Sequence, residues 1–169
     1  MAVEQVQSAQ IIPFRSRQRD PMQVRVEYLM GMMYEYGYGV EADIQEALRW
    51  YRSAADQGLA QAQNSLGFMY ILGLGVKRDA ERAAYWLQCA AEQSHSGAQT
   101  NLGVLYTNGQ GVEKDEEEAL YWFRSAARNG NIQAQKILTS AYSKGWYGLP
   151  RDFLQADFWR QRAKQCAAD

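Results

Sequence analysis

The sequence has few of the side chains on which catalysis and metal binding usually depend. Its 169 residues include one histidine, His95, and two cysteines, Cys89 and Cys166. A zinc site takes about four ligands, and His95 with one cysteine falls short of that number. The repeat geometry described below places no serine or cysteine nucleophile against His95, which is expected in an exposed linker. We therefore predict that the protein is not an enzyme and has no catalytic residues, no cofactor and no metal site.

The sequence also lacks long apolar runs. No segment approaches the roughly 18–20 apolar residues of a membrane span, and the first residues lack the features of a secretory signal. The two cysteines are interpreted as free thiols in a reducing compartment, with a mutual disulfide as the alternative. A cytoplasmic location is predicted, and a periplasmic one is the alternative if a signal peptide has been removed.

The charge is nearly balanced. A formal net charge of −1 gives no overall basic field that would attract nucleic acid or anionic lipid. We therefore expect a protein partner, with no nucleic acid and no membrane insertion. The sequence does not indicate an oligomeric state.

What the sequence does contain is a repeated unit. The same 36-residue step separates Gly31, Gly67 and Gly103, and a matching set of tryptophans at positions 50, 86 and 122. A fourth, looser copy carries one inserted residue. Self-similarity at such a period is typical of a solenoid, in which each unit buries its apolar face only against its neighbours.

Each unit is predicted to form two helices joined by tight turns. In the third copy, Gly109 is the expected left-handed end of the first helix. Asp115 is the expected N-cap of the second helix, with Glu118 completing a capping box. Arg82 replaces that acid in the second copy, so one contact is expected to be missing there. The repeats span about 24–58, 59–94, 95–130 and 131–169, and they form one all-α domain over residues 24–169.

The two ends of the chain depart from the repeat. Residues 1–23 are interpreted as a flexible leader whose segment 11–14 covers the first helix, or alternatively as a docking peptide for a partner. At the other end, Lys164 replaces the alanine of the other three repeats. Because lysine favours water, the last helix, residues 152–166, is predicted to be a polar cap.

Several other features have a structural interpretation. The paired glycines of each unit, such as Gly109 and Gly111, are attributed to turns rather than to a phosphate-binding loop. The acidic run 113–118 is attributed to a helix N-terminus rather than to a calcium site. Trp86 and Trp122 are expected to be buried and Trp159 to matter less. Trp146 is interpreted as a plug in the longer last turn, with a partner-binding anchor as the alternative.

The residues shared by the copies resemble a known family. The string A-x-A-x-x-x-L-G-x-x-Y-x-x-G-x-G-V-x-x-D-x-x-x-A-x-x-W-x-x-x-A-A-x-x-G is similar to the Sel-like repeat (SLR), a relative of the tetratricopeptide repeat (TPR). The resemblance covers roughly residues 24–164. It implies a right-handed α-solenoid that acts as an adaptor or scaffold and is often bacterial. Two alternatives are a self-associating scaffold and a hydrolase of cell-wall or β-lactam material, which members of a cysteine-rich branch resemble. This chain lacks the cysteine pairs of that branch.

The TPR relationship also implies a binding face. In that family, positions around the helix glycine line a concave groove that holds a peptide or helix of a partner. The corresponding residues here are Tyr28, Met32, Tyr36, Asn64, Phe68, Leu72, Thr100, Val104, Asn108, Lys136 and Lys144. The two lysines would favour an acidic end on the ligand. The alternative is an ordinary surface, with Ile71 and Leu72 partly buried by a turn.

Overall fold

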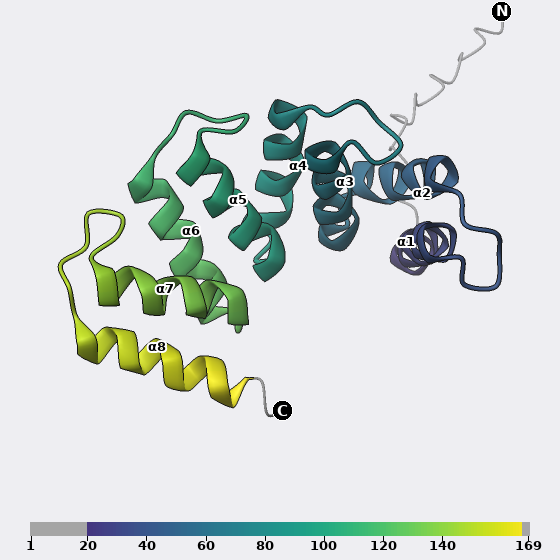
Figure 1. The fold of residues 1–169 in the computed structure, drawn as a ribbon. Coiled ribbons are helices and arrows are strands. Elements are labelled where there is room, and N and C mark those ends of the chain that lie inside the picture. The colour runs from purple at the N-terminus through teal and green to yellow at the C-terminus, as the bar shows by residue number, and fades with distance from the viewer. Residues whose placement is uncertain (1–19, 167–169) are drawn as a thin grey trace, which may run out of the picture.

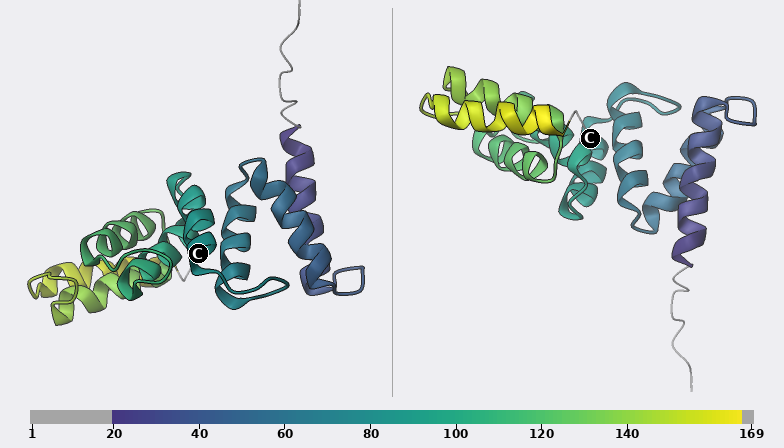
Figure 2. Two further views of the ribbon diagram at one scale, coloured as in Figure 1. Left: turned by 90° about the horizontal axis from the view of Figure 1, so that it is seen from above. Right: turned by 90° about the horizontal axis from the view of Figure 1, so that it is seen from below.

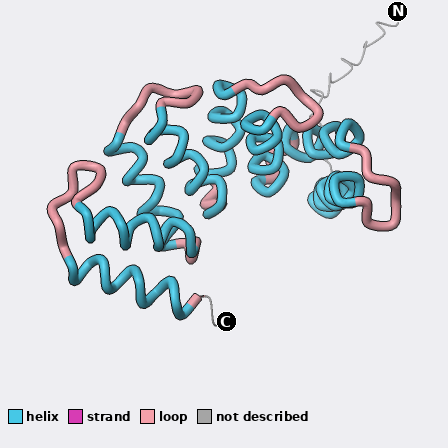
Figure 3. Tube along the Cα trace, viewed as in Figure 1, coloured by secondary structure: helices cyan, strands magenta, loops and turns pink. Residues whose placement is uncertain are grey.

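A computed structural model of the chain describes residues 20–166, and this part of the chain is helical with no strand. Its helices are α1 (Pro21–Tyr36), α2 (Ile44–Asp56), α3 (Ala60–Leu72), α4 (Ala80–Glu92), α5 (Ser96–Asn108), α6 (Glu116–Arg128), α7 (Ile132–Lys144) and α8 (Phe153–Gln165). The helix pairs follow one another along a curved path (Figure 1), and short turns join them (Figure 3). The main packing contacts join each helix to the next one along the chain. This arrangement confirms the predicted all-α solenoid.

The solenoid twists along its length. From above and from below, the axes of α7 and α8 lie across the axis of α1 (Figure 2). α1 begins at Pro21, and the side chain of Asp20 accepts a hydrogen bond from the backbone N–H of Met22. Residues 21–23 are therefore helical and do not belong to the leader. Proline suits this first turn, where its missing N–H would have no partner in the helix. The segment 11–14 that was expected to cover α1 lies outside the described residues.

The repeated helix glycine lets the two helices of a unit approach closely. A Cβ atom added at Gly103 would lie 2.7 Å from Cε1 of Phe123, which is only 1% exposed. A Cβ atom added at Gly31 would lie 2.5 Å from the ring of Tyr51, and one added at Gly67 would lie 2.8 Å from the side chain of Leu87. Each of the first three units is therefore closed by one large buried side chain of the second helix, packed on a glycine of the first helix.

The turns between paired helices follow one pattern. Gly37, Gly73, Gly109 and Gly145 end the first helices with positive φ angles of 65–75°. An aspartate then caps each second helix, as Asp115 does by accepting from the N–H groups of Glu117 and Glu118. The backbone N–H of Asp115 donates to the carbonyl of Tyr106, so it is not available to the side chain of Glu118. The predicted capping box is therefore wrong. Arg82 loses nothing by replacing the acid, and it forms an ion pair with Asp79 at 3.2 Å.

The units are joined by buried amide side chains that sequence analysis did not identify. Each of these glutamines donates to a carbonyl at the end of the preceding second helix: Gln63 to Ala55, Gln99 to Ala91 and Gln135 to Ala127. They recur at the 36-residue step, which was visible in the sequence. In the first unit, Glu27 takes this position and accepts hydrogen bonds from Ser53 and Gln57, each at 2.7 Å.

The tryptophans connect successive units, and their burial differs from what the sequence predicted. Trp122 packs with Ala90 and Ala91 of α4 and is 7% exposed. Trp159 packs with the corresponding alanines of α6 and is 8% exposed, so it is as buried as Trp122. Trp86 is only partly buried. The prediction that Trp86 is buried was therefore wrong, and the burial of Trp159 gives no reason to expect a smaller effect there than at Trp122.

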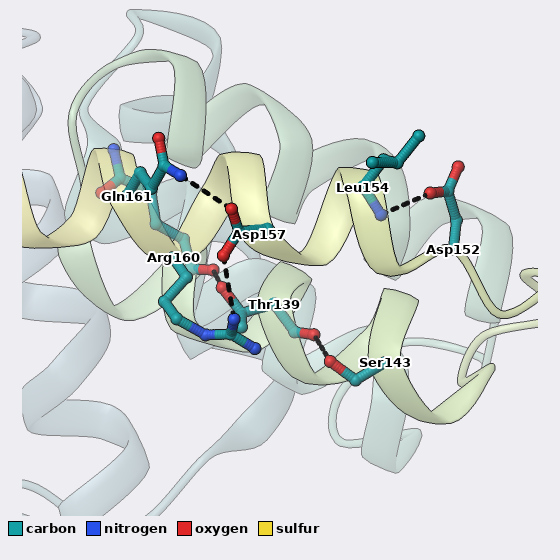
Figure 4. A network of polar contacts seen from close by, with 8 residues as sticks. Thr139, Ser143, Asp152, Leu154, Asp157, Arg160 and Gln161 are labelled. Carbon is teal, nitrogen blue, oxygen red and sulfur yellow. Dashed lines mark hydrogen bonds and ion pairs between the residues drawn. The ribbon is translucent and has the colours of Figure 1, made fainter.

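The outer side of α8 is not the polar cap that the repeat comparison predicted, because Phe153 and Leu154 are 72% and 85% exposed, although the helix also carries polar side chains. The carboxylate of Asp157 bonds to Arg160 at 3.0 Å and to Gln161 at 2.7 Å (Figure 4). Lys164 is exposed on the same helix. Inside the unit, Thr139 takes the place of the helix glycine and donates to the carbonyl of Gln135. The pairing of glycine with a large apolar side chain is therefore absent from the fourth unit.

His95 is not an exposed linker residue. It is the N-cap of α5, partly buried, and its Nδ1 atom accepts the backbone N–H of Ala98 at 3.1 Å. Asn131 does the same at the start of α7, accepting the N–H of Ala134 at 3.0 Å. The position thus supplies a side-chain cap in the third and fourth units, and imidazole can do so only while Nδ1 is unprotonated.

This cap predicts a pH dependence of stability. Burial lowers the pKa of His95 below its usual value of 6.5, so the unfolded chain binds the proton more readily than the folded one. We expect the full free energy of unfolding above pH ~6.5 and a loss of up to about 1 kcal/mol as the pH falls below that value. Urea unfolding between pH 7.5 and 5.5 measures it. His95→Asn should remove this loss and keep the free energy of unfolding at pH 7.5. If the free energy of unfolding of this variant still fell with pH as in the wild type, the assignment would be contradicted.

Candidate functional site

The candidate site is the surface formed by the residue that follows each helix glycine and by its neighbours on the first helices. We call it the first-helix face. The side chains of Phe68 and Val104 are 44% and 39% exposed. Met32 is partly buried and packs against the core of the first unit. Two apolar side chains at equivalent positions of α3 and α5 thus reach solvent, and a third does so in part.

The flanking residues divide into three groups by burial. Tyr36, Leu72, Asn108, Lys136 and Lys144 are exposed, and Tyr28 and Asn64 are partly buried. Thr100 is 8% exposed, and its hydroxyl donates to the carbonyl of Ser96 within α5. Thr100 was therefore wrongly expected on the surface. It is a small residue that turns its hydroxyl back to its own helix.

The α1 end of the face is aromatic and carries one carboxylate. Glu35 accepts a hydrogen bond of 2.5 Å from the hydroxyl of Tyr51. The ring of Tyr51 lies 5.6 Å from that of Tyr28, and the ring of Tyr36 lies 5.6 Å from that of Tyr38. The negative charge of Glu35 is the main cause that raises the pKa of Tyr36. Burial, followed by the bond to Glu35, raises the pKa of Tyr51.

The α7 end of the face is basic. Lys136 is exposed, and the ammonium group of Lys144 lies 4.5 Å from the ring centre of Trp146. Trp146 is 44% exposed, so it does not plug the long turn. Tyr147 does so instead, because it packs against the third core cluster with its ring 5.7 Å from Phe123. The preference for Trp146 as the plug was therefore wrong.

A second row of exposed aromatic residues lies on the second helices. Tyr85, Tyr121 and Phe158 are 61%, 57% and 48% exposed. Each packs edge-on against the tryptophan that follows it, with ring centres 4.9–5.1 Å apart. Sequence analysis missed this row, although each member directly precedes a repeat tryptophan. Its rings rest on tryptophan, as Tyr28 of the first-helix face rests on Tyr51.

A cavity of about 400 Å³ lies between the end of α4 and the side of α6. Its lining includes Glu92, Tyr121, Trp122, Arg128 and Asn129, but neither His95 nor a cysteine. Residues 20–166 hold no group of three or more His, Cys, Asp or Glu side chains suited to a metal ion. Cys89 and Cys166 are free, and the alternative of a mutual disulfide is contradicted.

The described helices also bear on membrane association. None of the helices between residues 20 and 166 has both the length and the apolar character needed to cross a bilayer.

These features define an α-solenoid repeat protein, and sequence comparison identifies its family. The Sel1 repeat matches residues 24–59, 60–95, 96–131 and 137–165. The chain belongs to the Sel1 repeat family, as its resemblance to the SLR indicated. Comparison with curated proteins gave no significant match.

Solved bacterial structures share the fold. A Sel1 repeat protein from Oxalobacter formigenes is 41% identical, with a TM-score of 0.80 over 84% of this chain and 58% of that one. c5321, a protective antigen of uropathogenic Escherichia coli with an SLR fold, is 37% identical, with a TM-score of 0.78 over 84% of this chain and 30% of that one. Cysteine-rich protein B of Helicobacter pylori is 25% identical, with a TM-score of 0.60 over 69% of this chain and 90% of that one. The chain thus spans little more than half of the first relative and under a third of the second.

Proposed function

We propose that the protein is a non-catalytic adaptor or scaffold that binds a peptide or helix of another protein on its first-helix face. The observation that carries the proposal is the exposure of Phe68, Leu72 and Val104 on adjacent first helices. Exposed apolar side chains rimmed by polar ones are typical of interaction sites. Aromatic residues such as Tyr36 are common anchors in them. We place this activity in the cytoplasm.

The variation between copies supports the same face. Positions that hold the units together keep their residue types, as the buried alanines at 55, 91 and 127 do. The position of Phe68, by contrast, holds Met32, Val104 and Ser140 in the other units. Because packing does not dictate these side chains, they are free to match a ligand.

Self-association by continued stacking is the weaker alternative. A second copy stacked on the end of the solenoid would bring α8 against α1 in the way that α6 meets α7. At that junction, Lys164 stands in α8 where the earlier second helices have alanine, and Val26 stands in α1 where the later first helices have alanine. Both changes add bulk where the internal junctions use Ala127 and Ala134, each 0% exposed.

Partner capture tests the proposal. We expect the double variant Tyr36→Ala/Phe68→Ala to lose a partner that the wild type captures from cell extract and that mass spectrometry identifies. Tyr36 and Phe68 are 55% and 44% exposed, so the melting temperature should change little. Tyr85→Ala/Tyr121→Ala removes two aromatic side chains of the second helices that are at least as exposed, and it should keep capture.

Two results would count against the first-helix face. A melting temperature of the Tyr36/Phe68 variant far below that of the wild type would show that these side chains belong to the core. Undiminished capture of the same partner by a well-folded variant would place the binding surface elsewhere.

A further inference from the structure

The α1 end of the first-helix face differs chemically from the rest of the face. Glu35 stands at a position that Ile71, Thr107 and Ser143 occupy in the later units. It is the one acidic residue among these four equivalent positions. It lies next to Tyr36, and its carboxylate accepts the hydroxyl of Tyr51. This combination, a carboxylate within a group of tyrosines, is absent from the equivalent positions of α3, α5 and α7.

Building on the proposed function, we infer that Glu35, with Tyr28, Tyr36 and Tyr38, forms a recognition site for a lysine or arginine side chain of the bound protein segment. A cation placed over a tyrosine ring within about 6 Å of its centre is attracted by the ring, most strongly where it is partly desolvated. A carboxylate beside the rings adds a direct ion pair. Arginine suits such a site best, because its planar guanidinium can stack on a ring and pair with a carboxylate at once.

The carboxylate is held in place but carries no internal counter-ion. The hydroxyl of Tyr51 donates to Oε2 at 2.5 Å, and Tyr51 itself is 1% exposed and locked over Gly31. Within residues 20–166, the ion pairs join Arg49 to Glu46, Arg82 to Asp79, Lys114 to Glu116 and Arg160 to Asp157. None of them involves Glu35, so its negative charge is left for a ligand.

Tyr28, Tyr36 and Tyr38 leave room for that ligand. Tyr36 and Tyr38 are 55% and 62% exposed, and Tyr28 is partly buried against Tyr51. An aromatic side chain that is preorganised and open loses little entropy on binding. The fixed carboxylate and the accessible rings together favour a cation over a neutral side chain.

The opposite end of the face carries the opposite charge. Lys136 and Lys144 of α7 are exposed, while α3 and α5 between the two ends present Phe68, Leu72 and Val104. A bound segment therefore meets a negative site at α1, an apolar middle and a positive site at α7. This order sets the direction of binding, with the basic residue of the ligand at α1 and its acidic residue at α7.

Titration with a small cation tests the site without knowledge of the partner. The probe is N-acetyl-arginine amide, and N-acetyl-norleucine amide is its neutral control. Binding to the full chain is followed by NMR with labelled tyrosine. We expect millimolar binding, with the arginine probe at least ~5-fold tighter than the control. Shifts should be confined to Tyr28, Tyr36, Tyr38 and Tyr51.

The variant Glu35→Gln should weaken binding of the arginine probe about 5- to 10-fold. Its amide oxygen can still accept from Tyr51, so the fold is retained, and the melting temperature verifies this. Glu46→Gln, which removes a partly exposed carboxylate of α2 that pairs with Arg49, is the matched control and should leave binding unchanged.

The inference is overturned if the neutral probe binds equally well, or if Glu35→Gln binds the arginine probe as the wild type does. Tyrosine shifts that map to Tyr85 and Tyr121 would also overturn it. These outcomes are separable from failure of the proposed function. Partner capture that depends on Phe68 would still stand if the arginine probe failed to bind.

Discussion

Replacing Gly111 by alanine should destabilise the protein by about 2–5 kcal/mol, from two costs that add. Gly111 has a φ of +70°, where a side chain costs about 1–2 kcal/mol. A Cβ at this position would lie 1.9 Å from the carbonyl oxygen of Ala80. That oxygen belongs to the backbone of the preceding unit, so it cannot be relieved by a change of rotamer. The junction between the second and third units must shift instead, at a cost of about 1–3 kcal/mol.

The equivalent glycines provide matched controls for this effect. Gly39 has nearly the same φ, +74°, but the nearest atom to its added Cβ is the terminal carbon of Met33, at 4.0 Å. Gly39→Ala should therefore cost only about 1–2 kcal/mol. Gly75, with the carbonyl of Ile44 at 3.1 Å, should fall between the two. Urea unfolding of the three variants measures the series. Equal losses would show that backbone conformation alone, and not the contact between units, makes glycine necessary.

Truncating Trp122 or Trp159 to alanine should cost about 3–5 kcal/mol in each case. Both side chains are more than nine-tenths buried, and each fills the space between its own unit and the preceding second helix. Trp86→Ala should cost clearly less, because Trp86 is only partly buried. Total stabilities of 5–15 kcal/mol are usual, so either large loss leaves the protein marginal.

Denaturant midpoints of the three tryptophan variants decide this ranking. A loss at Trp86 equal to that at Trp122 would mean that the first junction is packed as tightly as the second. A small loss at Trp159 would mean that the fourth unit contributes little to the cooperative fold, which its burial argues against.

Much of the fold could be predicted from the sequence because the repeat reports on packing directly. Gly67 and Gly103 recur at one step because each faces a large side chain of its partner helix. The turn glycines recur because they adopt positive φ angles. A residue type that returns once per unit therefore indicates a contact that is made once per unit. The helix pairs and the turns follow from this reasoning, whereas the polar cap inferred from Lys164 does not, because Phe153 and Leu154 of α8 are exposed.

Burial at single positions was harder to predict, because it depends on the neighbours that each unit has. Trp86 and Trp122 are equivalent in sequence, yet Trp86 is the more exposed. Thr100 lies at the position of Tyr28, but its small side chain is covered where the tyrosine reaches solvent in part. The capping role of His95 was missed because Leu59, at the same position of the second unit, makes no side-chain cap. The charge of Glu35 was visible, but its contact with Tyr51 requires the fold.

The most direct test of the account is a photo-crosslinking comparison between the two exposed rows of side chains. A photoreactive phenylalanine analogue is placed at Phe68 on the first-helix face, and separately at Tyr121 on the second helices, in cells that make the protein. Both positions are open to solvent, at 44% and 57%, so access alone does not favour either. The account predicts a discrete adduct with one partner protein at position 68, and none with that partner at position 121. A discrete adduct with a partner protein at position 121, and none at position 68, would contradict it.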